Sequence, residues 1–118
     1  MERDGMPGLD VRVAYAGGTL TVTPVGEIDH DSVTLFHQAV EGADVPWGTH
    51  VTIDLSAVTF MDSTGVHALL ACHQDAQDRG GALSVTGAHG VVARVLHLSG
   101  TLSLLRPPPP GSTRPGLN

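Results

Sequence analysis

The stretch of the sequence with the clearest chemical potential is Asp62-Ser63-Thr64-Gly65, which places two hydroxyls beside a carboxylate and a glycine. Before it, residues 51–55 alternate apolar and polar side chains as a β-strand does, and after it, residues 66–79 place apolar side chains at helical spacing. The tetrapeptide is therefore predicted at a strand-to-helix junction, where functional loops of α/β proteins gather. A hydroxyl there would face a helix N-terminus, whose free N–H groups favour negative charge.

Ser63 has two interpretations at this stage. In the first, it is an N-cap whose oxygen accepts a hydrogen bond from the first helical turn. In the second, it is phosphorylated, which adds about −1.5 to −2 charges at the helix start and opposes a partner closed over the loop. Thr64 offers the same chemistry one position later. Gly65 would allow either close approach of a partner's backbone or close packing of helix on sheet.

An acidic cluster, Glu27, Asp29 and Asp31, precedes another predicted helix. Asp29 and Asp31 are suitable N-caps, and the cluster fits either a first turn that complements the helix dipole or a contact with a partner. Paired carboxylates can perform acid–base catalysis, but nothing else in the sequence builds a pocket for it. The Asp-Thr-Gly triplet of aspartic proteases differs from the Asp62 motif by one residue and needs a second lobe, so we reject it.

The sequence lacks the residue spacing that is typical of metal sites and of other common enzyme sites. The seven histidines form no His-x-x-x-His pair and no His/Cys cluster at ligand spacing. There is no Gly-x-Ser-x-Gly elbow and no phosphate-binding glycine loop. His73 is predicted to be a hydrogen-bonded interior histidine and Cys72 a small buried packing residue. We therefore expect no enzyme, no metal and no cofactor.

Apolar spacing predicts the elements that position these residues: strands over 9–15 and 19–25, a helix over 32–43, a strand over 51–55, a helix over 66–79, a strand over 83–86, a helix over 91–98 and one apolar turn over 102–105. Gly17-Gly18 joins the first two strands as a β-hairpin, and the later helices imply parallel strands. Because the strands alternate, helices should cover mainly one face. The expected fold is α/β, one domain with a mixed sheet of four to five strands. Pro24 should lie on an edge or at a strand end.

The composition disfavours some classes of partner, and the local sequence predicts where the domain begins and ends. The formal charge is −6 with no lysine, which disfavours nucleic acid and anionic membranes. No apolar run approaches the ~20 residues of a membrane span, no signal region opens the chain, and the single cysteine suits a reducing, cytoplasmic location. Residues 1–8 are expected to be a flexible lead-in. Residues 106–118, with four consecutive prolines, are expected to be a disordered tail that is either solvated or bound in an aromatic groove.

A family resemblance is carried by Leu55-Ser-Ala-Val-Thr-Phe-Met-Asp-Ser-Thr-Gly-Val-His-Ala-Leu-Leu70, which is similar to the signature of the STAS domain. Within that family it is closest to the bacterial anti-sigma factor antagonists. Gly26-Glu27-Ile28-Asp29 resembles the second recurring piece of the family, and Gly80-Gly81 with Leu98-Ser99-Gly100 fits its C-terminal pattern. The resemblance spans residues 9–105, which we expect to form the STAS domain.

The resemblance implies a partner switch. Ser63 would be phosphorylated by an anti-sigma factor that is itself an ATP-dependent serine kinase, and a PPM-type phosphatase would remove the phosphate. The unphosphorylated domain would bind the anti-sigma factor and so release a sigma factor. We expect the partner-binding residues to be Glu27, Asp29, Asp62, Thr64 and Gly65, on a monomer or weak dimer. The alternative keeps the fold but makes the domain a signalling or scaffold module in a larger complex, without phospho-switching.

Overall fold

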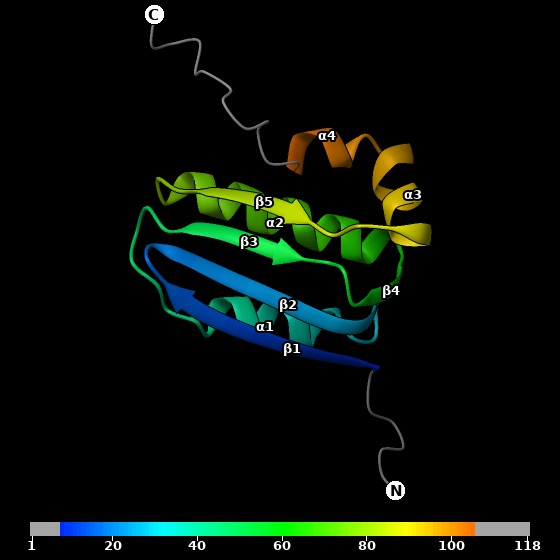
Figure 1. The fold of residues 1–118 in the computed structure, drawn as a ribbon, viewed down its shortest axis with the longest axis horizontal. Coiled ribbons are helices and arrows are strands. Elements are labelled where there is room, and N and C mark those ends of the chain that lie inside the picture. Colours follow the sequence, from blue (N-terminus) through cyan, green and yellow to red (C-terminus); the bar gives the residue numbers. More distant parts are fainter. Residues whose placement is uncertain (1–7, 106–118) are drawn as a thin grey trace, which may run out of the picture.

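The computed structural model describes residues 8–105, which form one mixed β-sheet with helices against it (Figure 1). In chain order the elements are β1 (Leu9–Ala16), β2 (Thr19–Ile28), α1 (Val33–Glu41), β3 (His50–Asp54), β4 (Val58–Met61), α2 (Ser63–Asp78), β5 (Ala82–Thr86), α3 (Gly90–Leu98) and α4 (Thr101–Leu105). Each predicted strand and helix is present, β4 is additional, and α2 begins at Ser63 instead of Val66. The predicted lead-in and proline tail lie outside the described residues, apart from Gly8.

The sheet has five strands in the order β1-β2-β3-β5, with β4 pairing with β2 beyond the end of β3. β1 and β2 form the antiparallel hairpin, and Gly17 and Gly18 turn the chain with φ of 59° and 82°, values that glycine adopts without strain. The pairs β2–β3, β2–β4 and β3–β5 are parallel. The expected mixed α/β sheet with an N-terminal hairpin is therefore confirmed.

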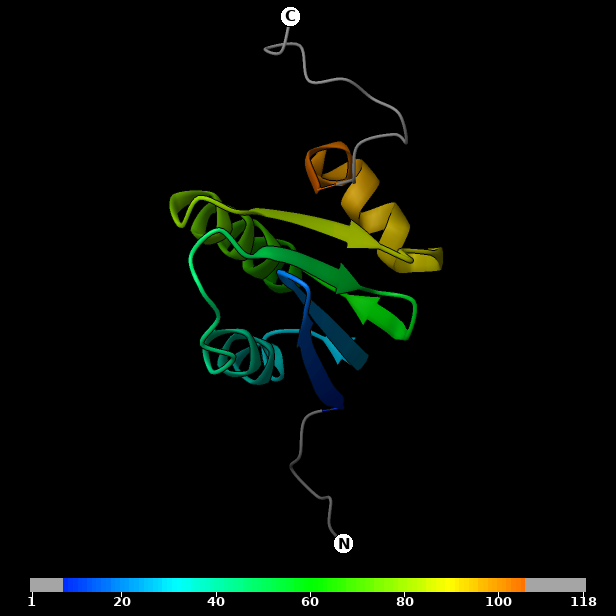
Figure 2. The same ribbon diagram turned by 60° about the vertical axis from the view of Figure 1, so that its left-hand side comes forward.

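One face of the sheet carries the hydrophobic core. The register aligns apolar side chains from neighbouring strands, and all of the following are buried: Leu20, Val22, Val51, Ile53, Leu83 and Val85. α1 and α2 lie against this face, while α3 and α4 lie beyond the β5 edge (Figure 2). The opposite face carries half-buried threonines of β2 and β3 and has no helix across it in this view. Helices thus cover mainly one face, as the alternating strands predict.

The sheet is interrupted between β3 and β4, and the interruption explains Pro24. The N–H of Ser56 donates to Asp54 Oδ1 at 2.9 Å, and that bond together with the Ser56 hydroxyl lowers the pKa of Asp54. The N–H of Gly26 donates to Ala57 O. Backbone nitrogens two residues apart point to the same side of a strand, so the nitrogen of Pro24 also faces β3 and β4. It lies between the stretch of β2 that pairs with β3, residues 19–22, and the stretch that pairs with β4, residues 26–28. The prediction that Pro24 lies at an edge or at a strand end is wrong, because β2 continues to Ile28 and has β1 on one side and β3 and β4 on the other. The proline is tolerated because no strand pairs with β2 at the gap that Pro24 faces, so no N–H is needed at this position.

Candidate functional site

The candidate site forms where the carboxyl ends of β2 and β4 lie side by side. The parallel register pairs Ile28 with Met61, and the N–H of Asp62 donates to Ile28 O at 3.3 Å. The acidic segment after β2 and the Asp62 loop after β4 therefore adjoin each other, although more than thirty residues separate them in the sequence. The sequence predicted each segment separately, and the β2–β4 pairing brings them together.

Asp62 caps α2. Its backbone is extended, and its Oδ1 accepts hydrogen bonds from the N–H of Thr64 at 2.9 Å and of Gly65 at 3.4 Å. Its carbonyl accepts from the N–H of Val66 at 3.2 Å, which starts the helical pattern. A side-chain oxygen at this position satisfies N–H groups that have no partner within the helix. The interpretation of Ser63 as the N-cap is therefore wrong, and the preceding residue performs that role.

Ser63 is the first residue of α2, and its side chain is exposed. Within residues 8–105, the hydroxyl of Ser63 takes part in none of the side-chain hydrogen bonds. Thr64, one position later, is half-buried. A group added to the Ser63 oxygen would thus meet solvent and the positive end of the helix dipole, and it would not displace a structural bond made by that oxygen.

Gly65 is buried against the sheet, directly beneath the loop. A Cβ at this position would lie 2.5 Å from Met61 Cγ and 3.1 Å from Ile28 Cγ2, distances too short for ordinary contact. Of the two interpretations that the sequence left open for Gly65, the structure supports close packing of helix on sheet. The expectation that Gly65 also contacts a partner stays a prediction.

The acidic segment is organised by a hydrogen-bonded turn. Asp29 Oδ1 accepts from the N–H groups of Asp31 and Ser32, each at 3.0 Å. The buried hydroxyl of Ser32 donates to Glu27 O at 2.7 Å and accepts from the N–H of Asp29 at 3.0 Å. Ser32, and not Asp29 or Asp31, occupies the N-cap position of α1, so the prediction of an aspartate N-cap is wrong. Asp29 instead holds the turn that leads into the helix.

The ends of β2 and β4 beside the Asp62 loop carry carboxylates and an exposed aromatic side chain. Glu27 is exposed and lies opposite Phe60 in the β2–β4 register, and Phe60 is 40% exposed. Asp29 and Asp62 are half-buried at the same edge. Sequence reasoning missed Phe60, because β4 buries only its first and last residues and so lacks the alternation that identifies a strand. An exposed aromatic beside the Asp62 loop is suited to contact with a protein partner.

Two interior predictions on α2 have different outcomes. Cys72 is buried, and burial together with the charges of Asp75 and Glu41 raises the pKa of its thiol to about 12, so the prediction of a packing cysteine is confirmed. His73 is half-buried, and its buried Nδ1 has no hydrogen-bond partner. The prediction that His73 is hydrogen-bonded is therefore wrong for this nitrogen.

Metal-binding clusters and membrane-spanning helices are absent from the part of the chain that the structure describes. Residues 8–105 contain no group of three or more His, Cys, Asp or Glu side chains placed to hold a metal ion. Within the same range, none of the helices is both long and apolar enough to cross a membrane. The candidate site is thus a loop surface formed by carboxylates, hydroxyls and Phe60.

Comparison with known proteins identifies the family. Residues 10–113 match the model of the STAS domain, so the chain belongs to the STAS domain family, as its signature segment predicted. The Anti-sigma F factor antagonist of Paenibacillus polymyxa is 26% identical over 98 residues, which are 82% of this chain and 84% of that protein. An anti-sigma factor antagonist from Mycobacterium paratuberculosis shares 29% identity, with a TM-score of 0.71 over 82% of each chain.

The fold agrees with a third protein. The anti-sigma factor antagonist SpoIIAA in its unphosphorylated form superposes with a TM-score of 0.65 over 80% of this chain and 84% of that chain. Its sequence identity is 21%, so this likeness shows the fold alone. The predicted STAS-like α/β architecture is confirmed by these similarities.

Proposed function

We propose that this chain is an anti-sigma factor antagonist whose docking to its partner is controlled by phosphorylation of Ser63. Two relatives that cover more than four-fifths of the chain are anti-sigma factor antagonists. The observation that carries the proposal is the state of Ser63: its hydroxyl is exposed at the start of α2 while Asp62 performs the structural capping. A cap serine would lose its bond on modification, whereas this serine is free to accept a phosphate.

In the proposed mechanism, the unphosphorylated loop docks on an anti-sigma factor that is also a serine kinase. Glu27, Asp29, Asp62 and Thr64 surround Ser63 on the docking surface, with Phe60 as an apolar contact. The bound anti-sigma factor can then no longer hold its sigma factor. Transfer of the γ-phosphate of ATP forms a bond from phosphorus to Ser63 Oγ, breaks the bond to the β-phosphate oxygen and releases the hydroxyl proton.

Phosphorylation would separate the partners by electrostatics. The phosphate adds about −1.5 to −2 charges to a surface that already carries three carboxylates. Of the three described arginines, Arg12 pairs with Asp10 and Arg79 with Asp75, while Arg94 of α3 forms no ion pair with a described residue. In a closed interface the phosphate would be desolvated beside these carboxylates, which opposes docking. A PPM-type phosphatase would restore the docking surface, and the cycle would run in the cytoplasm.

A pull-down from the source organism tests the proposal. Wild type, Ser63→Ala and Ser63→Asp proteins are immobilised, the captured proteins are identified by mass spectrometry, and ATP is then added to the loaded beads. We expect wild type and Ser63→Ala to capture an anti-sigma factor, Ser63→Asp to lose it, and phosphate to appear on wild type alone. Equal capture by all three proteins would instead favour a scaffold or signalling module without phospho-switching.

A further inference from the structure

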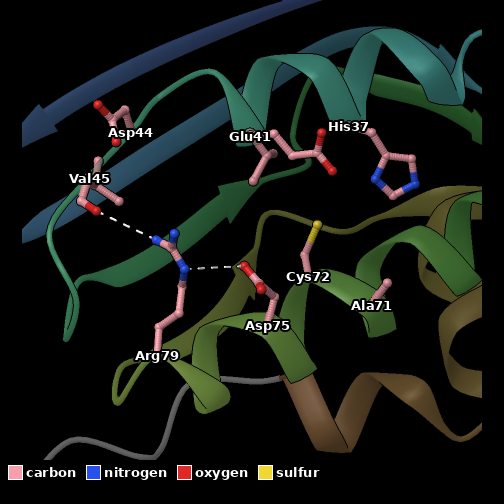
Figure 3. A pocket seen from close by; sticks show the side chains of 9 residues that line it. His37, Glu41, Asp44, Val45, Ala71, Cys72, Asp75 and Arg79 are labelled. Carbon is pink, nitrogen blue, oxygen red and sulfur yellow. Dashed lines mark hydrogen bonds and ion pairs between the residues drawn. The ribbon is translucent and has the colours of Figure 1, made fainter.

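A cavity of about 360 Å³ lies between α1 and α2, away from the Ser63 loop (Figure 3). Its walls come from α1, from the loop that follows α1, and from the C-terminal half of α2, which contributes Cys72, Asp75 and Arg79. At 1.5 Å per residue, Cys72 lies ~13 Å along the helix axis from Ser63. The volume falls within the range of small-molecule sites, so the cavity is a candidate site distinct from the switch.

The mouth of the cavity carries an excess of negative charge. Three carboxylates line it, those of Glu41, Asp44 and Asp75, against one guanidinium, that of Arg79, and the imidazole of His37. Arg79 is already engaged: its Nε lies 3.8 Å from Asp75 Oδ2, and its Nη1 donates to Val45 O at 3.5 Å (Figure 3). Glu41 and Asp44 form no ion pair or side-chain hydrogen bond with any residue between 8 and 105. Two carboxylates are therefore available to an incoming cation.

The floor of the cavity is apolar. Val40, Val45 and the thiol of Cys72 line it, and the Cys72 thiol is neutral because burial and the charges of Asp75 and Glu41 raise its pKa to about 12. A narrower space of about 40 Å³ continues inward, where side chains of the sheet, Leu20, Val51 and Leu83, complete its lining. Such a recess holds a short alkyl chain better than it holds a polar group.

We propose that this cavity is a binding site for a small organic cation, a guanidinium or ammonium group on a short alkyl stem. The charged head would lie beside the carboxylate of Glu41, with that of Asp44 at the Val45 end of the cavity (Figure 3), and the stem would cover Val40, Val45 and Cys72. A neutral ligand would desolvate these carboxylates without compensation, and an anion would meet their repulsion. The proposal is independent of the role of Ser63.

Trp47 provides a built-in reporter for the test. It is the single tryptophan of the chain, and Arg79 stacks on its ring with the guanidinium carbon 5.6 Å from the centroid. Because Arg79 also lines the cavity, a cation that disturbs the Arg79–Asp75 pair changes the surroundings of the indole. Fluorescence titration of the full chain, checked by calorimetry, therefore measures occupancy directly.

The experiment compares butylguanidinium with butylurea, which has nearly the same shape and no charge. We expect butylguanidinium to saturate with a dissociation constant on the order of 1 mM or tighter, and butylurea to bind at least about tenfold more weakly. Equal affinity of the two compounds, or no saturable binding of butylguanidinium up to about 10 mM, overturns the proposal.

Variants of matched shape locate the site. Glu41→Gln and Asp44→Asn should each weaken butylguanidinium binding about threefold to tenfold. Asp78→Asn is the control, because Asp78 is exposed on the same helix, contacts Gln74 and does not line the cavity. Its affinity for butylguanidinium should equal that of wild type. An equal loss in all three variants would show a general charge effect and reject the assigned site.

Discussion

Substitution of Gly65 by alanine is the sharpest test of how the Ser63 loop is held on the sheet. The added Cβ would lie 2.5 Å from Met61 Cγ, 3.1 Å from Ile28 Cγ2 and 3.2 Å from Ile28 O. Overpacking of this kind costs ~1–3 kcal/mol, and the better helix propensity of alanine offsets up to ~1 kcal/mol of it. The contact of 2.5 Å with the buried Met61 places the cost in the upper part of that range, ~2–3 kcal/mol. We therefore expect a net loss of ~1–2 kcal/mol in the free energy of unfolding, equivalent to a decrease of at least ~4 °C in Tm.

A double-mutant cycle with Met61→Ala separates this clash from other effects. Truncation at Met61 removes the Cγ atom that the new methyl group would strike, so Gly65→Ala should cost ~1 kcal/mol less in the Met61→Ala background. Urea denaturation followed by circular dichroism gives the four free energies of unfolding. Met61→Ala itself costs ~2–5 kcal/mol, because it leaves a cavity in the core.

Two results would refute the packing argument for Gly65. The first is a Gly65→Ala variant as stable as wild type, which would mean that the backbone yields at no cost. The second is a cycle without coupling between Gly65 and Met61. If stability were unchanged and partner binding were lost, Gly65 would be a contact residue, as one interpretation of the sequence held.

Three further predictions concern α2. Asp62→Ala should cost ~1–2 kcal/mol in unfolding free energy because the N–H of Thr64 loses its acceptor, whereas Asp62→Asn, which retains a capping oxygen, should cost less than half as much. Ser63→Asp should change the free energy of unfolding by less than ~1 kcal/mol, because the helix dipole favours the new charge, and it should weaken partner binding. The control is Gln77→Glu, which adds the same charge at the exposed far end of α2 and should leave partner binding unchanged. The buried Cys72 thiol has its pKa raised to about 12 from 9.0, so the folded state retains a proton that the unfolded chain releases above pH 9. Stability should therefore be complete below pH 9 and decline by up to ~1.4 kcal/mol per pH unit above it, so that urea midpoints at pH 8 and 10.5 diverge in wild type but not in Cys72→Ala.

The strand and helix order was predictable because local periodicity specifies it. Residues 51–55 alternate and residues 66–79 repeat at helical spacing, so the junction at Asp62-Ser63 was found from sequence. The one-sided helix cover followed from the same alternation. These features depend on neighbours within one or two turns of chain, which a single sequence contains.

The missed features depend on partners that are distant in sequence. β4 buries Val58 and Met61 with two exposed residues between them, because the β2–β4 register shifts beside Gly26, and this pattern has no strand period. Asp62 became the cap because β4 ends at Met61, one residue before it. Pro24 is tolerated inside the sheet because the β3–β4 interruption faces it.

The candidate site was predicted in its chemistry and incompletely in its geometry. Ser63 at a helix start was deduced from sequence, and its exposure is visible only in the structure. Glu27 and Asp29 were predicted as partner contacts, but the sequence offered no reason for them to lie near Ser63. The pairing of β2 with β4 is that reason. The cavity had no signal at all, since Glu41 and Asp75 belong to different helices whose packing the sequence does not specify.

The central claim is that a phosphate on Ser63 decides whether the partner docks. The most direct measurement is the affinity of the anti-sigma factor, purified after capture from the source organism, for the unphosphorylated protein and for the protein phosphorylated on Ser63 alone. A desolvated charge without a partner costs ~3–5 kcal/mol, so the account predicts at least about a hundredfold weaker binding after phosphorylation. Equal affinity of the two forms, or phosphate found only on another residue, would contradict it.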